Sequence, residues 1–378
     1  MAKKFDWKQA EHRMLTEVSQ INDYIDLTDE EVKTLEEVLK SYPMCITPYY
    51  LSLVDKEAGA EDPIRKMCVP SVAEMDVSGA FDTSGEGTNT VLRGLQHKYH
   101  ATALILSTSK CAMYCRHCFR KRLVGADSEG ETVGNIDEMA EYVKSHPEIS
   151  NVLISGGDSL LNENETIRKY LEKFTQIDNL DLIRFGTRIP VVLPERIYGD
   201  EELLEMLEEY GKKKQIFLVT QFNHPREITY ESKKAIDALK KRGIVVRNQT
   251  VLLNGVNADP VILGQLFRRL TSIGVIPYYI FQCRPVTGVK NRFQVPITEG
   301  IDIVQKAKNM QNGQGKSVRF CMSHPRGKIE FVGKTKSGKV LMKFHQAKND
   351  EDAGRLFTVK IDDTDCWLPE NIEYEDLI

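Results

Sequence analysis

The chain has 378 residues and a formal net charge of −4, with 41% hydrophobic and 28% charged residues. This composition is ordinary for a soluble globular protein, and so small a charge gives no electrostatic reason to expect nucleic acid or an anionic membrane as a partner. No apolar run is long enough to span a bilayer, and the first residues lack the apolar stretch of a secretory signal. We therefore expect a cytoplasmic protein.

The first part of the chain is predicted to be helical. Residues 5–41 follow a helical pattern, and Thr28 with Glu31 three positions later has the form of an N-terminal capping box. Several prolines then break the chain into turns, and the polar, glycine-rich residues 79–94 predict a loop or linker. We place a helical region with its linker at residues 1–95.

From about residue 96, apolar runs rich in β-branched residues alternate with amphipathic helical stretches, which predicts a parallel sheet covered by helices. The predicted strands are 103–109, 151–155, 182–187, 216–222, 244–253 and 276–282. The predicted helices between them are 136–146, 163–177, 200–213, 231–242 and 258–273. Five crossovers between six strands favour an α/β core at residues 96–290, either a partial (β/α)6 barrel or a doubly wound sheet, because a full eightfold barrel needs more repeats. Residues 291–378 form a mixed region, with a helix predicted at 300–310 and short strands after it.

Three of the eight cysteines, Cys111, Cys115 and Cys118, lie within eight residues, directly after the first predicted strand. Loops at the carboxyl ends of parallel strands are where such folds place their active sites. A closed zinc site needs four ligands, usually as two separated pairs, and here the only nearby additional donor is His117. Three thiolates suit a cubane cluster in which one iron keeps no protein ligand and can bind a substrate or cofactor. The triplet therefore predicts a [4Fe–4S] cluster.

The CxxxCxxC spacing on the first strand–helix loop is the signature of radical S-adenosylmethionine (SAM) enzymes, and CAMYCRHCFRKR closely resembles the version in lysine 2,3-aminomutase and its relatives. The resemblance covers nearly the whole chain, from CITPYYLSL and GLQHKY through VLISGGDSLL, RFGTRIPVVLP, QFNHPREIT and NQTVLLNGVN to SHPRGKIE. It implies a radical SAM barrel and an isomerase that moves the α-amino group of an amino acid from C2 to C3 while pyridoxal 5′-phosphate (PLP) holds the amino acid. It also implies a small-molecule amino-acid substrate, an electron donor such as flavodoxin or ferredoxin, and a homo-oligomer.

By this resemblance, the SAM site includes Gly156, Gly157 and Asp158, which follow the second predicted strand. Two glycines let the backbone approach a ligand closely, and a carboxylate can accept hydrogen bonds from the SAM ammonium group. Three further residues at strand ends are implied to line the SAM pocket: Gln221, His224 and Gln249. The alternative is that these polar residues only cap the ends of strands.

Lys328 is the residue that the resemblance implies for covalent attachment of PLP, and Gly327 before it would give the lysine room to reach the cofactor. This chain departs from the family here, because the aminomutases carry several glycines before the lysine and this chain has HPRGK. Lys98 and Tyr99 align with a basic–aromatic pair that is implied to bind the PLP phosphate. A second family arginine in that region is Thr102 in this chain.

For the substrate, the resemblance implies that Arg120 binds the α-carboxylate. Lysine 2,3-aminomutase recognises the distal ammonium of lysine with two aspartates, and the aligned residues here are Arg284 and Cys321. An ammonium about 4 Å from a guanidinium would meet a repulsion of about 4 kcal/mol at an effective dielectric constant of about 20. Lysine is therefore disfavoured, and we expect an acidic or polar amino acid such as glutamate, unless Arg284 points away or pairs with a local acid.

The resemblance leaves rival functions open. The C-terminal zinc site of the family is missing, since only Cys366 remains in that region, so no structural zinc is expected. One rival is a radical SAM enzyme that consumes SAM without PLP, and another is an enzyme that modifies a protein lysine. A third is a non-catalytic iron–sulfur protein.

Overall fold

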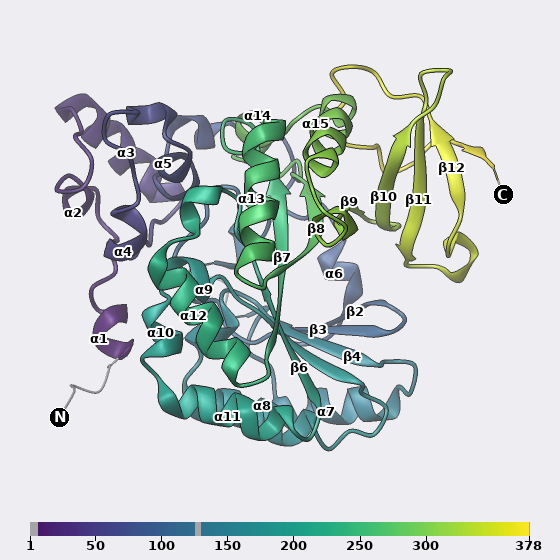
Figure 1. Cartoon of the computed structure of the whole chain (residues 1–378), viewed down its shortest axis with the longest axis horizontal. Coiled ribbons are helices and arrows are strands. Elements are labelled where there is room, and N and C mark those ends of the chain that lie inside the picture. Colours follow the sequence, from purple (N-terminus) through teal and green to yellow (C-terminus); the bar gives the residue numbers. More distant parts are fainter. Residues whose placement is uncertain (1–6, 125–129, 378) are drawn as a thin grey trace.

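One continuous sheet runs through most of the chain, and its strand order follows the chain order from β1 to β13 (Figure 1). The computed structural model describes residues 7–124 and 130–377. The N-terminal helices and the C-terminal strands β10–β12 lie on opposite sides of the molecule, with the strand–helix core between them (Figure 1).

The core of the sheet is formed by parallel strands, as the alternation of apolar runs predicts. They are β3 (Thr102–Leu106), β4 (Asn151–Ser155), β5 (Leu182–Gly186), β6 (Gln215–Thr220), β7 (Val245–Leu252) and β8 (Ile276–Gln282). The six predicted strands are thus confirmed, and β9 (Arg319–His324) adds another parallel strand beside β8. The sheet does not close into a full barrel, which agrees with the partial barrel expected from the sequence.

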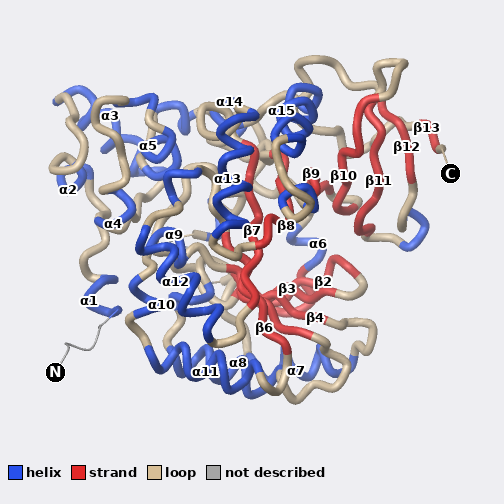
Figure 2. Tube along the Cα trace, viewed as in Figure 1, coloured by secondary structure: helices blue, strands red, loops and turns tan. Residues whose placement is uncertain are grey.

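Helices cover the outer face of the parallel strands (Figure 2). The crossover helices are α7 (Ile136–Ser145), α8 (Asn164–Phe174), α11 (Glu201–Gly211), α12 (Tyr230–Lys241) and α13 (Pro260–Ser272), and α15 (Ile297–Asn309) follows β8. Each buries an apolar stripe; in α8 the stripe consists of Ile167, Tyr170, Leu171 and Phe174. The crossover helices match their predicted ranges closely.

The inner face of the sheet differs from that of most parallel sheets, which are apolar on both faces. In β5, Ile183 and Phe185 are buried against the helices, whereas Arg184 and Gly186 between them face a cavity. Gln249 and Val251 of β7 line the same cavity. The period-two alternation of a strand therefore aims polar side chains inward, where a ligand can reach them.

The N-terminal region is helical, as predicted, with α1 (Trp7–Glu11), α2 (Val18–Ile21), α3 (Asp29–Ser41), α4 (Pro48–Leu51) and α5 (Pro63–Cys68). The capping box before α3 is confirmed, because Thr28 Oγ1 accepts a hydrogen bond from the Glu31 N–H, and the Glu31 carboxylate accepts one from the Thr28 N–H. None of the helices in the described ranges is both long and apolar enough to cross a membrane.

The prediction of a loop or linker at residues 79–94 is wrong in part, because much of this segment is regular structure. It contains α6 (Glu86–Asn89) and β1 (Thr90–Leu92), and β1 pairs with β2 (Leu95–Tyr99), which is antiparallel to β3. The Asp82 carboxylate accepts hydrogen bonds from the N–H groups of Ser84, Glu86 and Gly87, which fixes the entry to α6. Gly94, at φ +72°, makes the turn between β1 and β2.

The C-terminal region is mixed, as expected, and joins the same sheet through antiparallel pairs. Its strands are β10 (Gly327–Lys334), β11 (Val340–Ala347), β12 (Leu356–Val359) and β13 (Glu375–Asp376). The remaining short helices are α9 (Ile189–Val192), α10 (Glu195–Tyr198) and α14 (Lys290–Phe293), and the 3₁₀ turns are η1 (Gly59–Glu61), η2 (Val72–Met75), η3 (Lys121–Leu123), η5 (Ser159–Leu161), η6 (Pro225–Glu227), η7 (Gly315–Ser317) and η8 (Asp350–Asp352). The pairing of β9 with β10 brings Lys328 onto the edge of the core.

Candidate active site

A cavity of about 690 Å³ opens along the inner face of the parallel strands. It brings together nearly all the residues that the sequence singled out, although they come from distant parts of the chain. The predicted residues that line it are Lys98, Tyr99, Cys111, Cys115, Cys118, Arg120, Gly156, Gly157, Asp158, Gln221, Gln249, Arg284 and Lys328.

The cysteine loop after β3 is held by the turn after β4. The N–H of Gly157 donates to the Thr108 carbonyl at 2.6 Å, and the N–H of Asp158 donates to the Lys110 carbonyl at 2.7 Å. A Cβ on Gly157 would lie 2.1 Å from the Lys110 carbonyl oxygen. The glycine is thus required where this turn meets the cysteine loop, whereas the sequence suggested only an approach to a ligand.

The three cysteines have the donor chemistry that a cluster needs. Burial, with the negative charges of the neighbouring Asp158 and thiols, raises the pKa of Cys111, and burial raises the pKa of Cys118 to about 11. Such thiols give up their protons when a metal replaces them. Within the described residues, no group of three or more His, Cys, Asp or Glu side chains is arranged around a single metal ion. A cubane places each ligand sulfur on a different iron, so three separate thiolates on one loop fit the cluster better than a lone ion.

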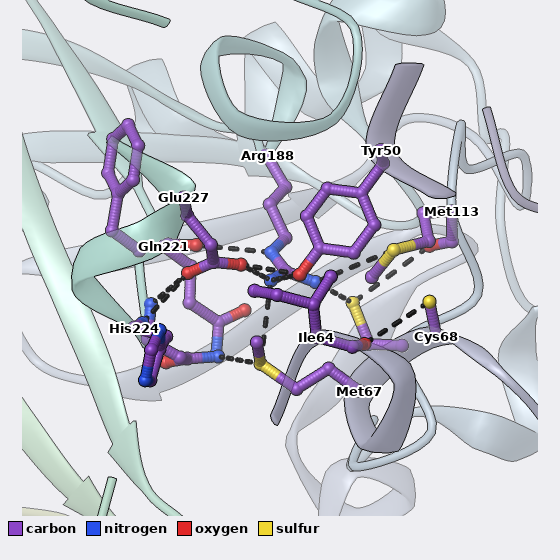
Figure 3. Close-up of polar contacts among 12 residues, drawn as sticks. Tyr50, Ile64, Met67, Cys68, Met113, Arg188, Gln221, His224 and Glu227 are labelled. Atoms are coloured by element: carbon purple, nitrogen blue, oxygen red, sulfur yellow. Dashed lines mark hydrogen bonds and ion pairs between the residues drawn. The ribbon is translucent and has the colours of Figure 1, made fainter. Parts of the chain in front are cut away.

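Arg188, a residue that the sequence did not single out, lies beside this loop at the centre of a buried polar network (Figure 3). Its Nη1 donates to Cys115 Sγ at 2.9 Å, and its Nε donates to the Gln221 carbonyl at 3.1 Å. Its Nη2 contacts the Tyr50 hydroxyl and the Glu227 carboxylate. Arg188 therefore links a cluster cysteine to the N-terminal helices and to the end of β6. Its only signal in the sequence was its place in the RFGTRIPVVLP motif.

His224 is not among the residues that line the cavity. Its Nδ1 accepts a hydrogen bond from the Arg226 N–H at 3.2 Å, and its own N–H donates to Glu227 at 2.9 Å. It therefore caps η6, and burial lowers its pKa. This is the arrangement of a strand-end cap, the alternative left open by the sequence, and a contact of His224 with SAM stays a prediction.

Asp158 lines the cavity, but its carboxylate already has three donors. It accepts hydrogen bonds from the Thr187 hydroxyl, from the Arg188 N–H at 2.7 Å and from the Leu160 N–H at 3.2 Å. Burial raises its pKa to about 6, although these bonds act in the opposite direction. Asp158 thus ties the end of β4 to the end of β5.

Lys328 lies on β10 in a cage of aromatic rings. Its Nζ donates to Gln346 Oε1 at 2.8 Å and lies 4.2 Å from the centre of the Tyr279 ring, with Tyr99 and Phe281 farther out. Burial, aided by the charges of Arg184 and Arg284, lowers the pKa of Lys328 to about 8. A lysine whose amine is partly neutral near physiological pH is suited to attack an aldehyde, so this residue fits covalent attachment of PLP.

Gly327 serves the strand pairing rather than the reach of the lysine. A Cβ at this position would lie 2.3 Å from the Gln346 carbonyl oxygen on β11. The preceding Arg326 pairs with Asp352 and is not part of the cavity lining. The glycine expected to give Lys328 room therefore lets β10 and β11 approach.

The depressed pKa of Lys328 leads to a prediction about pH. Only the neutral amine attacks an aldehyde, and a pKa of about 8 in place of the usual ~10.4 makes that form dominant above pH 8. The rate at which the apoprotein captures PLP should rise about tenfold per pH unit below pH 7 and level off above pH 8 to 9. Stopped-flow absorbance of PLP mixing would measure this, and a rate still rising at pH 10 would contradict the assignment.

Several cationic side chains lie around Glu86 in the cavity wall. Arg120 Nε donates to Glu86 at 2.9 Å, and Arg122 contacts the same carboxylate at 3.4 Å. Burial acts to raise the pKa of Glu86, but the charges of Arg120, Arg284 and Arg122 outweigh it and the pKa is lowered. Lys98 donates to the His324 carbonyl at 2.7 Å, and burial with the Arg284 and Lys348 charges lowers its pKa to about 7. Asp82 and Glu131 add negative charge here, because Asp82 acts on Lys98 and Arg284, and Glu131 pairs with Arg122.

Arg284 is directed at the cavity and stacks on Phe119, with its Cζ 4.1 Å from the ring centre. Among the described residues, its guanidinium has no hydrogen-bond or ion-pair partner. Cys321, the other position aligned with a lysine-binding aspartate, is buried in β9 and does not line the cavity. Of the two alternatives left open for Arg284, the structure excludes that it points away.

An open strand–helix sheet with three cysteines on the loop after its first parallel strand defines a radical SAM enzyme, and the profile of the Radical SAM superfamily matches residues 105–262. The chain is 38% identical to a putative L-lysine 2,3-aminomutase of Aquifex aeolicus over 352 residues, which cover 92% of each chain. It is 38% identical to the L-lysine 2,3-aminomutase of Clostridium subterminale (82% of this chain, 73% of that one) and 34% identical to the glutamate 2,3-aminomutase of Clostridioides difficile (85% and 75%). The chain therefore belongs to the radical SAM amino-acid 2,3-aminomutase family and is an isomerase. This membership implies a [4Fe–4S] cluster, SAM and an external reductant.

Proposed function

We propose that the chain is a PLP-dependent aminomutase that moves the α-amino group of an acidic or polar amino acid, glutamate first among them, from C2 to C3. The observation that carries the proposal is the cavity, which has cluster-type cysteines, a lysine with a lowered pKa and several guanidinium groups on its walls. When bound, the cluster and SAM supply radical chemistry, and PLP carries the amino group during its move.

The chain's own residues would divide this work by position. Cys111, Cys115 and Cys118 hold the cluster. The turn at Gly156 and Gly157 borders SAM next to them, together with Asp158, Gln221 and Gln249. Lys328 attaches PLP, and Lys98 and Tyr99 face its phosphate. An electron carrier such as flavodoxin or ferredoxin would reduce the cluster.

Arg120 and Arg284 are proposed to bind the two carboxylates of an acidic substrate. Arg120 is held by Glu86 and lies two residues beyond Cys118, so an α-carboxylate bound to it stays near the cluster. Arg284 keeps its donors for a second anionic group and would repel the distal ammonium of lysine. The walls then exclude water from the reacting carbons, which protects a radical reaction from side reactions.

The test is an anaerobic assay of the reconstituted protein with SAM, dithionite and PLP, with lysine and glutamate offered separately. We expect β-glutamate to form without a matching amount of 5′-deoxyadenosine, because SAM is regenerated in each cycle. Deoxyadenosine that accumulates without any β-amino acid would support the rival enzyme that consumes SAM without PLP. If neither product forms, a non-catalytic iron–sulfur protein is the better description.

Arg284→Gln tests the substrate class. Loss of a guanidinium that pairs with a substrate carboxylate typically costs about 2–5 kcal/mol, so kcat/KM for glutamate should fall roughly 30-fold to 5,000-fold. Activity with a neutral amino acid of similar length should change much less. An equal loss with both substrates would show that Arg284 supports the cavity wall and does not select the substrate.

A further inference from the structure

The floor of the cavity carries a second arginine that the proposed function does not yet use. Arg184 faces the cavity from β5, and its Nη2 donates to Asn151 Oδ1 at the start of β4. Asn151 in turn donates from Nδ2 to Thr102 Oγ1 at 3.1 Å, and the two residues are paired in register on β4 and β3. Three neighbouring strands thus place a guanidinium, an amide and a hydroxyl side by side.

The hydrogen-bond donors and the charge of Arg184 are only partly satisfied by other residues of the protein. Its buried Nε has no hydrogen-bond partner among the described residues. Among the same residues it has no ion pair, and the neighbouring cation Arg247 acts to lower its pKa. Burial is the main cause that lowers its pKa. A guanidinium held in this way lacks an anion.

The position of Arg184 relative to Lys328 indicates which anion this is. Both side chains line the same cavity, and the charge of Arg184 acts to lower the pKa of Lys328. Thr102, which lines the cavity beside it, occupies the position where related aminomutases carry an arginine. This part of the cavity wall therefore combines the charge of Arg184 on β5 with the hydroxyl of Thr102 on β3.

We infer that Arg184, with Thr102, binds the phosphate of the PLP attached to Lys328, as a positioning residue. The inference rests on the proposed use of PLP. An arginine presents several N–H donors to a phosphate, and Asn151 fixes the direction of the guanidinium so that little rotational freedom is lost on binding. A carboxylate of the substrate is the other anion that could bind to Arg184.

The test compares PLP with pyridoxal, which has the same aldehyde and no phosphate. Both are titrated into wild-type protein and Arg184→Gln, and binding is followed by absorbance and by borohydride trapping on Lys328. The wild type should prefer PLP, and Arg184→Gln should lose about 30-fold or more in PLP affinity with pyridoxal affinity unchanged. Arg184→Lys should recover part of the preference.

Arg247→Gln is the matched control, because Arg247 is a neighbouring guanidinium that stacks on Phe217 and Tyr278 at 4.8 and 4.9 Å and does not line the cavity. It should keep the preference for PLP. An equal loss of PLP and pyridoxal binding in Arg184→Gln, or unchanged PLP binding with a raised substrate KM, would overturn the inference. Wild-type protein that binds neither compound would instead refute the use of PLP itself.

Discussion

Lys328→Ala is expected to abolish the formation of β-amino acid, with a loss of roughly 10³-fold or more. The amine of Lys328 lies within the aromatic cage of the cavity, and the lowered pKa of this amine makes it a nucleophile near physiological pH. The variant should no longer trap PLP with borohydride, whereas its iron content should equal that of the wild type. The measurements are a product assay, borohydride trapping and iron per chain.

Lys334→Ala provides a control on the same strand. Lys334 ends β10, where it pairs with Asp302 at 2.7 Å, and it does not line the cavity. We expect wild-type activity and PLP trapping from this variant. Covalent PLP on Lys328→Ala would contradict the assignment of this lysine, and a loss of iron would indicate damage to the fold.

Arg188→Gln should lower the free energy of unfolding by about 3–5 kcal/mol. The substitution leaves the fully buried carboxylate of Glu227 without its cation, and breaking a buried ion pair from one side costs about this much. Urea denaturation of the apoprotein measures it. Arg242→Gln, which breaks partly exposed pairs with Glu201 and Glu208, should cost much less.

The double variant Arg188→Gln/Glu227→Gln separates two roles of this arginine. Removing both charges should recover part of the stability, since no unpaired ion stays buried. The hydrogen bond from Arg188 to Cys115 is still missing, so the reduction potential of the reconstituted cluster should stay below that of the wild type in both variants. A redox titration followed by electron paramagnetic resonance would measure it, and an unchanged potential would limit Arg188 to a structural role.

The sequence predicted most of the core because each element leaves a local signal. The apolar runs of β3 to β8 and the stripes of the intervening helices are visible within ten residues. The pairing of β1 with β2 was missed, because it lies at the end of a segment whose composition indicates a loop, and the Asp82 carboxylate that caps α6 there leaves no periodic signal. The limits of the three predicted regions, 1–95, 96–290 and 291–378, stay predictions, and one sheet crosses the limit between the last two.

The candidate site likewise contains some residues that could be predicted from the sequence and others that could not. The cysteine triplet is a local motif, and its place after the first strand could be predicted. The partners of Asp158 lie about thirty residues further along, so its hydrogen bonds to Thr187 and Arg188 have no local signal. Arg188 itself is one basic residue in an apolar stretch, and only its burial beside Glu227 distinguishes it from a surface arginine.

The agreement of strand order with chain order bears on how the protein is assembled during synthesis. Each strand pairs only with the strands that precede and follow it, so the sheet can grow as the chain leaves the ribosome. About two hundred residues separate the cysteine loop from Lys328. The strands that flank the cysteine loop can therefore pair before the strand that carries Lys328 is translated.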